Sequence, residues 1–207
     1  MKINRKNNLT QYQAGVGLID VMVAVFILSV GLLAISALQL ISKQSNFEAI
    51  QRSHASALAY DLFERMRSNS GTALSTTNPL TYYVNSGTVI FNHNTPVTLT
   101  PPVDCKTAYC DPQNLAAWDL IEWQRSVRGE LETRGGNNVG GLFEPTACLS
   151  GPSPGPSGNY RLTITWRGQA KIKDQQPGNT CGTSLYGAAN EYRRILVLDS
   201  YLGPSQI

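Results

Sequence analysis

An apolar stretch near the N-terminus constrains the fold of this chain more than any other feature. Residues 16–41 read VGLIDVMVAVFILSVGLLAISALQLI and contain a single ionisable side chain, Asp20. The part from Val21 to Leu38 has 18 consecutive residues without a charge, which is long enough for a membrane-spanning helix. We therefore expect this stretch to insert into a membrane.

The segment before the apolar stretch is basic and ends in small residues. Residues 1–15 carry no acid and three basic side chains, Lys2, Arg5 and Lys6, so we expect this end to stay in the cytoplasm. In a secretory signal peptide the small-residue cleavage site follows the apolar region, which is then discarded. Here the small-residue junction precedes it, so cleavage at that junction would leave the apolar helix on the mature chain.

The junction itself, Gly15–Asp20 with the sequence GVGLID, resembles the type IV pilin signature. The resemblance implies that a prepilin peptidase cuts between Gly15 and Val16 and that Val16 becomes N-methylated. It also makes Asp20 the acid at the fifth mature position. The family usually has Phe or Met at the first mature position and Glu at the fifth, whereas this chain has Val and Asp.

The lone carboxylate of Asp20 needs a partner whatever the family. An acid near the centre of a bilayer costs about 2.5–3.5 kcal/mol on insertion scales, and less near the edge. The freed amine of Val16 would lie one helical turn before Asp20, and the helix dipole favours an acid at this end. We therefore expect Asp20 to pair with an N-terminal amine, its own or a neighbouring copy's, when helices assemble. The alternative is that Asp20 only marks the membrane boundary.

Length and charge fit a small anchored domain. The expected parts are a leader of residues 1–15, a transmembrane and assembly segment of residues 16–41, and an exported globular domain of residues 42–207. The formal net charge of +3 disappears with the leader, because removing its three basic residues from 17 leaves 14 against 14 acids. A formally neutral mature chain gives no support for nucleic-acid binding, and none is predicted.

The four cysteines all follow the apolar stretch. An even number of cysteines in an exported domain predicts disulfides rather than a metal site, and the two histidines have no paired spacing. Three pairings are open, and we favour the local one, Cys105–Cys110 with Cys148–Cys181. No metal and no cofactor are expected.

The helix is predicted to continue beyond the apolar stretch to about Asn69. Residues 42–69 contain no Pro or Gly, and apolar side chains recur there at close to helical spacing: Phe47, Ala55, Leu58, Leu62 and Met66. Two i,i+4 ion pairs, Glu48 with Arg52 and Asp61 with Arg65, are expected on the other face.

The remainder of the chain mixes a helix with short strands. Asp111-Pro112 is a helix-start signal, and an apolar face follows it to about Leu131. Alternation predicts a strand at residues 160–167, and a second strand is expected at residues 194–201, RILVLDSY. A hairpin is expected between Tyr82–Val84 and Thr88–Phe91. Residues 135–158 are predicted to be loop, and the three tryptophans to be core.

These elements predict an α+β fold in which the long N-terminal helix, half membrane and half amphipathic, packs on a small antiparallel sheet with one additional helix. Four segments are similar to the PilV type of minor pilin: Ala59–Asn69, Asn114–Trp123, Ile164–Arg167 and Asn190–Leu202. That resemblance implies a pilin-like subunit that helps to initiate pilus assembly in a tip complex and supports adhesion and twitching motility.

The resemblance also implies partners and a location. The partners would be other minor pilins and the major pilin, through the N-terminal helix, and the prepilin peptidase. The chain would cross the inner membrane of a Gram-negative bacterium once, with its N-terminus in the cytoplasm, and then join an extracellular pilus.

Two other functions remain open. A minor pseudopilin of a type II secretion system shares the leader and the helix, and a single-pass anchor could instead carry a periplasmic enzyme or binding domain. No HExxH or phosphate-loop pattern occurs in the chain, and enzyme activity is not expected.

Overall fold

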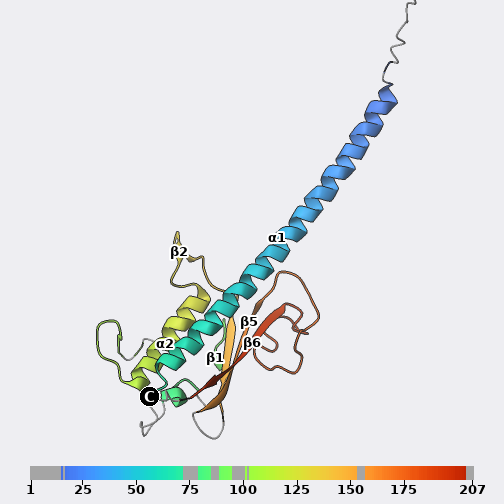
Figure 1. The fold of residues 1–207 in the computed structure, drawn as a ribbon. Helices are drawn as coiled ribbons and strands as arrows, with labels where there is room; N and C mark the ends of the chain where they lie inside the picture. The colour runs from blue at the N-terminus through green and yellow to red at the C-terminus, as the bar shows by residue number, and fades with distance from the viewer. Residues whose placement is uncertain are drawn as a thin grey trace, which may run out of the picture. The chain divides into compact units, whose positions relative to one another are not determined.

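The computed structural model of the chain describes Gly15 and residues 17–71, 79–84, 89–94, 101, 103–152 and 157–203 (Figure 1). Its contacts divide the chain into two units, Met1–Ser45 and Asn46–Ile207. The long helix α1, Leu18–Ser68, contributes residues to both units. It ends one residue before Asn69, the end that the sequence predicts.

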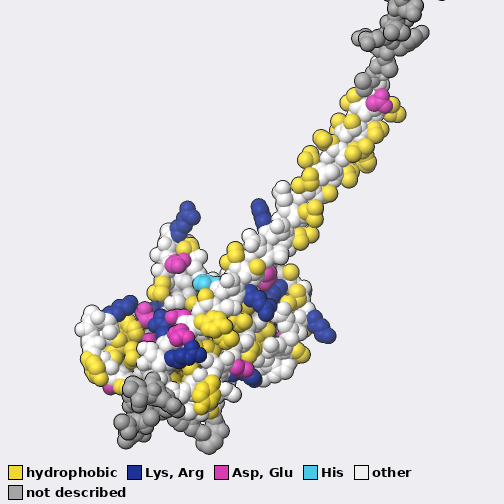
Figure 2. Space-filling view, in the orientation of Figure 1, with side chains coloured by type: hydrophobic (Ala, Val, Ile, Leu, Met, Phe, Trp, Pro, Cys, Tyr) yellow, Lys and Arg dark blue, Asp and Glu magenta, His cyan; other side chains and the backbone are white. Residues whose placement is uncertain are grey.

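In the first unit, the N-terminal half of α1 is apolar on all sides. Every residue from 18 to 45 is exposed, and hydrophobic side chains cover this half of the helix in Figure 2. Two hydroxyl groups in this half bond to the backbone of the preceding turn, since Ser29 donates to the carbonyl of Phe26 and Ser36 to that of Leu32. By length and composition this helix could cross a membrane.

In the second unit, the other half of α1 is amphipathic. Its buried side chains recur at helical spacing, and they are Gln51, Ala55, Leu58, Ala59, Leu62, Phe63 and Met66. Four of the five predicted apolar positions are among them, and Phe47 is half-buried. Arg65 pairs with Asp61 as expected, with 3.0 Å between the charged atoms. The predicted ion pair between Glu48 and Arg52 is wrong, because Glu48 pairs with Arg194 instead.

The second helix, α2, spans Pro112–Arg128 and lies beside the C-terminal half of α1 (Figure 1). The Asp111 side chain accepts from the backbone N–H of Asn114 at 2.8 Å, which makes it the predicted N-cap. The helix ends at Gly129, which adopts a left-handed conformation, so the apolar face does not reach Leu131, which is exposed.

The main sheet has four antiparallel strands in the order β1-β4-β5-β6. Their bounds are Val89–Phe91, Thr146–Ser150, Gly158–Arg167 and Arg193–Leu202. The two long strands, β5 and β6, pair in unbroken register, with Ile164 opposite Leu196. A separate two-stranded ribbon joins β2, Thr133–Arg134, to β3, Asn137–Asn138. The predicted α+β class is confirmed.

Two local predictions are wrong. The hairpin does not form, because Pro79–Tyr82 is a 3-10 helix, η1, and β1 pairs with β4. Strand β4 lies inside the stretch predicted to be loop. Its central residues are buried between β1 and β5, which is an effect of tertiary packing that a local pattern does not encode.

One hydrophobic cluster joins α1, α2 and the sheet. Two of the three tryptophans are fully buried in it, Trp123 and Trp166. The indole N–H of Trp123 donates to the carbonyl of Leu58 at 2.7 Å and so ties α2 to α1. Trp118 is only half-buried, with the ammonium of Lys106 5.5 Å from its ring centroid, so the prediction that all three are core is wrong for this residue.

Candidate functional site

The candidate assembly site is the start of α1. The backbone N–H of Gly17 donates to a carboxylate oxygen of Asp20 at 3.1 Å, and the N–H of Asp20 donates to the carbonyl of Gly17 at 3.0 Å. The first N–H groups of a helix have no partner within the helix, so the Asp20 carboxylate satisfies one of them. The acid therefore lies at the positive end of the helix dipole.

The predicted processing residues adjoin this start. Gly15 is exposed, and a Cβ atom added there would meet no other atom within 4 Å. Val16 lies outside the described residues. Cleavage after Gly15, methylation of Val16 and a contact between its amine and Asp20 therefore stay predictions.

The start of α1 has one charged group, the carboxylate of Asp20, and that carboxylate determines what this end of the helix can bind. Asp20 carries the only ionisable side chain between residues 16 and 41. Among the described residues its carboxylate accepts one backbone hydrogen bond, whereas a carboxylate can accept about four. Capacity is left for a donor that is not part of the helix, and a cationic amine would make the stronger, charge-assisted kind of bond.

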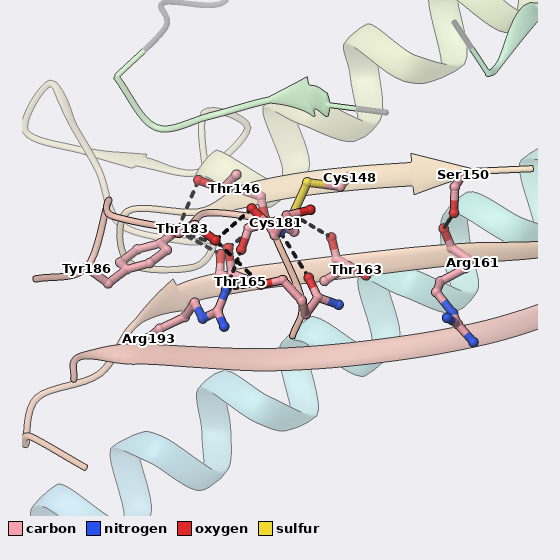
Figure 3. Close-up of a disulfide and its surroundings, with 12 residues drawn as sticks. Thr146, Cys148, Ser150, Arg161, Thr163, Thr165, Cys181, Thr183, Tyr186 and Arg193 are labelled. Atoms are coloured by element: carbon pink, nitrogen blue, oxygen red, sulfur yellow. Dashed lines mark hydrogen bonds between the residues drawn. A yellow bond between two sulfur atoms is a disulfide. The ribbon is translucent and has the colours of Figure 1, made fainter. Parts of the chain in front are cut away.

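Two disulfides lie in the second unit. Cys105 is bonded to Cys110 in the loop before α2, and Cys148 on β4 is bonded to Cys181 in the segment between β5 and β6 (Figure 3). These are the two local pairs that we favoured from the sequence. The second disulfide joins the long β5–β6 connection, residues 168–192, to the sheet.

Arg193 holds the same connection from its other end. Its side chain is completely buried, and its guanidinium donates to both carboxylate oxygens of Asp174 at 2.8 and 2.9 Å. It also donates to the backbone carbonyls of Asn179, Gln176 and Cys181 at 2.7–2.9 Å. Although partial desolvation opposes the change, these hydrogen bonds lower the pKa of Asp174. Nothing in the sequence predicts this arrangement except a basic residue at the start of an apolar strand.

A second buried polar cluster joins α1, η1 and α2. The Tyr83 hydroxyl donates to the Asp119 carboxylate at 2.6 Å, and Asn69 donates to the Tyr83 oxygen at 3.2 Å. Arg65 reaches Asp119 at 3.4 Å. Desolvation raises the pKa of Asp119 despite these partners. Every group in the cluster is hydrogen-bonded, which indicates a structural role.

Within the described ranges, no group of three or more His, Cys, Asp or Glu side chains could hold a metal ion. The site residues that the sequence predicts form no catalytic cluster in this part of the chain, since Asp20 lies in the first unit and the disulfides in the second.

Residues 37–121 match the Tt1218-like family, described as type IV pilin Tt1218. The matched segment begins within α1 and ends within α2. No curated protein and no solved structure matches the chain.

The architecture of the chain is pilin-like, with a long apolar N-terminal helix, a second helix and a small antiparallel sheet. Together with the family match over residues 37–121, it supports a similarity to the type IV pilins. The match does not reach the junction at Gly15 or the strands β4 to β6, and it does not test the PilV subtype.

Proposed function

We propose that the chain is a minor pilin of a type IV pilus, of the PilV type. The observation that carries this proposal is the N-terminal half of α1, where the apolar side chains are exposed and one acid stands at the start. In a pilus such helices pack against each other, which gives each apolar surface a partner. The pilin family match supports the same function.

The proposal includes the processing of the chain. A prepilin peptidase would cut between Gly15 and Val16, remove the basic leader and leave Val16 N-methylated. Before assembly the chain would cross the inner membrane of a Gram-negative bacterium once, with the leader in the cytoplasm. Afterwards it would belong to an extracellular pilus together with other minor pilins and the major pilin.

In this function Asp20 guides assembly. A subunit that leaves the bilayer would place its carboxylate beside the N-terminal amine of its own or a neighbouring helix. In an apolar surrounding, the ion pair is strongly preferred over two separated charges. Through this contact the subunit would join the complex that initiates the pilus and so support adhesion and twitching motility.

The test compares Asp20→Ala with Asp20→Glu in cells that make pili. Asp20→Ala is expected to insert into the membrane normally but to be lost from the sheared pilus fraction, whereas Asp20→Glu keeps the charge and is expected to be incorporated. Immunoblots of the membrane and pilus fractions measure both. Normal incorporation of Asp20→Ala would contradict the role of this acid.

The processing step is tested by mass spectrometry of the protein recovered from sheared pili. The expected mature N-terminus is N-methylated Val16. An intact Met1 would contradict the pilin function itself and favour a domain on an uncleaved anchor.

A further inference from the structure

The two edges of the four-stranded sheet differ in length and regularity. Strand β1 has three residues, and its register with β4 is irregular. Strand β6 has ten residues, contains no proline and pairs with β5 in unbroken register. Short or irregular edge strands prevent further pairing, whereas a long and regular edge strand is a template for another strand. The edge at β6 is therefore the side at which this sheet can be extended.

The backbone of β6 has unused hydrogen-bonding groups. In an antiparallel pair, alternate residues direct their N–H and C=O groups away from the partner strand. Among the described residues, no hydrogen bond from outside β5 reaches the backbone of residues 195–201. Within this range Asp199 and Tyr201 are exposed, and residues 196–198 and Ser200 are half-buried. Solvent therefore reaches this edge of the sheet.

Helix α1 runs along β6 and forms a wall beside it. Near the start of the strand, the Arg194 guanidinium binds Glu48 of α1 at 3.0 Å. Near its end, Arg67 of α1 donates to the Ser200 hydroxyl at 2.8 Å. Tyr60 lies two turns before Arg67 on the same face of α1 and is 58% exposed. An edge strand beside a helix is an arrangement that binds extended peptides.

A half-open cavity of about 230 Å³ lies between α1 and the start of β6. Its lining includes Ala49 and Arg52 of α1 and Ile195 of β6. Pockets for drug-sized ligands measure about 300–1,000 Å³, so this smaller cavity suits one side chain of a docked strand. Arg52 is exposed, and its guanidinium makes no hydrogen bond or ion pair with the described residues. This charge favours an acidic side chain.

We propose that the edge of β6 binds an extended segment of another protein, which joins the sheet as a fifth strand beside α1. The edge supplies backbone hydrogen bonds, and side chains of the segment alternate between the α1 side and the outer face of the sheet. An acid on the α1 side near the start of β6 pairs with Arg52. The inference rests on the second unit alone and does not depend on the pilus function.

Strand β6 of a second copy fits this edge less well. Its only acid, Asp199, is next to Ser200, which contacts α1, so it projects from the opposite face of the sheet. There the carboxylate of Asp199 already binds Arg161 at 2.7 and 2.9 Å. Pairing between two copies of β6 would bring no acid to Arg52. A strand of a different protein with an acid on the α1 side satisfies both the backbone and this charge.

The test presents a probe strand to the full chain in detergent. A segment of about seven residues that alternates glutamate with valine is fused to the C-terminus through a Gly/Ser linker of about twelve residues. Such a linker spans about 20 Å and gives an effective concentration in the millimolar range. The control fusion has proline in place of each valine, which keeps the charge but prevents strand pairing. Hydrogen exchange of both fusions is measured by mass spectrometry of peptic fragments.

The glutamate–valine segment is expected to slow amide exchange in residues 195–201 about tenfold relative to the proline control and to leave α2 unchanged. Arg52→Gln should reduce this slowing about threefold, since an exposed ion pair is lost. Arg134→Gln removes the same charge from an exposed position in β2 and should have no effect. No slowing beyond the proline control, or equal effects of the two arginine variants, would overturn the proposal.

The unfused chain distinguishes another protein from a second copy. Exchange in residues 195–201 is measured at two protein concentrations about tenfold apart. Equal rates are expected, because β6 is not expected to pair with itself. Rates that fall as the concentration rises would show that two copies pair through this edge and would overturn the assignment to another protein.

Discussion

At the scale of single residues, Arg193 shows how a charge can organise a long loop. The guanidinium group is fully buried, yet each of its three nitrogens has at least one acceptor within 3.3 Å. A buried arginine is tolerated only when its charge and its donors are matched in this way. The carbonyls that it binds come from the β5–β6 connection, so the loop takes its conformation from one strand residue.

We expect Asp174→Asn to destabilise the chain by about 3 kcal/mol at neutral pH, because it leaves the buried Arg193 without its counter-charge. Since the pKa of Asp174 is lowered in the folded state, its stabilisation is complete above about pH 4 and is lost as the pH falls through the folded pKa. Urea denaturation of both proteins at about pH 7 and about pH 2 measures the difference, which should shrink in acid.

The control for this prediction is Asp61→Asn. Asp61 pairs with Arg65 at the surface, so its loss should cost no more than about 1 kcal/mol at neutral pH. A difference between wild type and Asp174→Asn that stays the same at both pH values would contradict the ionic role of Asp174.

Residues whose role depends on local periodicity could be predicted from the sequence, whereas ion pairs across the fold could not. The helical spacing of Ala55, Leu58 and Leu62 predicts one buried face, and that face is buried. Glu48 and Arg52 are four residues apart, so the sequence predicts an ion pair between them. In the structure Glu48 instead accepts two hydrogen bonds from the largely buried guanidinium of Arg194, 146 positions further along the chain. Only the three-dimensional fold brings that partner near.

At the scale of elements, the end of α2 depends on backbone shape more than on side chains. Gly129 has φ of 69°, and its N–H donates to the carbonyl of Ser126. A Cβ atom there would lie 1.8 Å from the carbonyl oxygen of Gly140. Helix α2 can therefore stop here and let the chain pass close to Gly140 only because this position is glycine.

The variants Gly129→Ala and Gly135→Ala separate the cost of the left-handed backbone conformation from the cost of the clash with Gly140. Gly135 also has positive φ, 60°, but a Cβ atom there would meet nothing within 4 Å. We expect Gly135→Ala to cost about 1 kcal/mol, for the left-handed conformation alone, and to lower Tm by about 3 °C. Gly129→Ala adds a backbone clash and should lower Tm by about 10 °C. Equal shifts in a thermal melt would refute the close approach of the two backbone segments.

The two disulfides should differ in their effect on stability. Cys148–Cys181 closes a loop of 33 residues and Cys105–Cys110 a loop of 5. In the chain-entropy model these loops correspond to about 4 and about 2 kcal/mol at 25 °C. Replacing each pair by alanines and measuring urea denaturation tests the order. If removing the Cys105–Cys110 pair lowered the free energy of unfolding more, native contacts and not loop length would determine how much each disulfide stabilises the chain.

Elements with their own local signal could be predicted, and those that depend on a partner could not. Apolar and polar residues alternate along β5 from Tyr160 to Arg167, β6 is rich in β-branched and apolar residues, and α2 carries its N-cap signal in Asp111-Pro112. Strand β4 has five residues, lies between glycine-rich segments and gains its burial from both neighbours in the sheet. The sequence pattern places Tyr83 in a strand, but in the structure it follows η1 and its hydroxyl donates to Asp119 of α2. No short-range pattern predicts this contact.

At the scale of the whole molecule, buried surface is distributed unevenly along the chain. The hydrophobic cluster consists of residues between Ala55 and Leu202, and no residue from 18 to 45 is buried. The N-terminal motif could be found from the sequence because cleavage and membrane insertion depend on linear features. The contact between Gly17 and Asp20 needed the structure, because it depends on where backbone and side-chain atoms point.

This distribution predicts that residues 46–207 fold without the segment before them. Since none of the described residues of that segment is buried, its removal should change the free energy of unfolding by less than about 0.5 kcal/mol and Tm by less than about 2 °C. The full chain should need detergent, whereas the truncated chain should not, because it lacks the exposed apolar helix. Thermal melts of both proteins in the same detergent, and sedimentation of the truncated chain without it, measure the two effects. A fall in Tm of more than about 5 °C would mean that the N-terminal half of α1 stabilises the second unit.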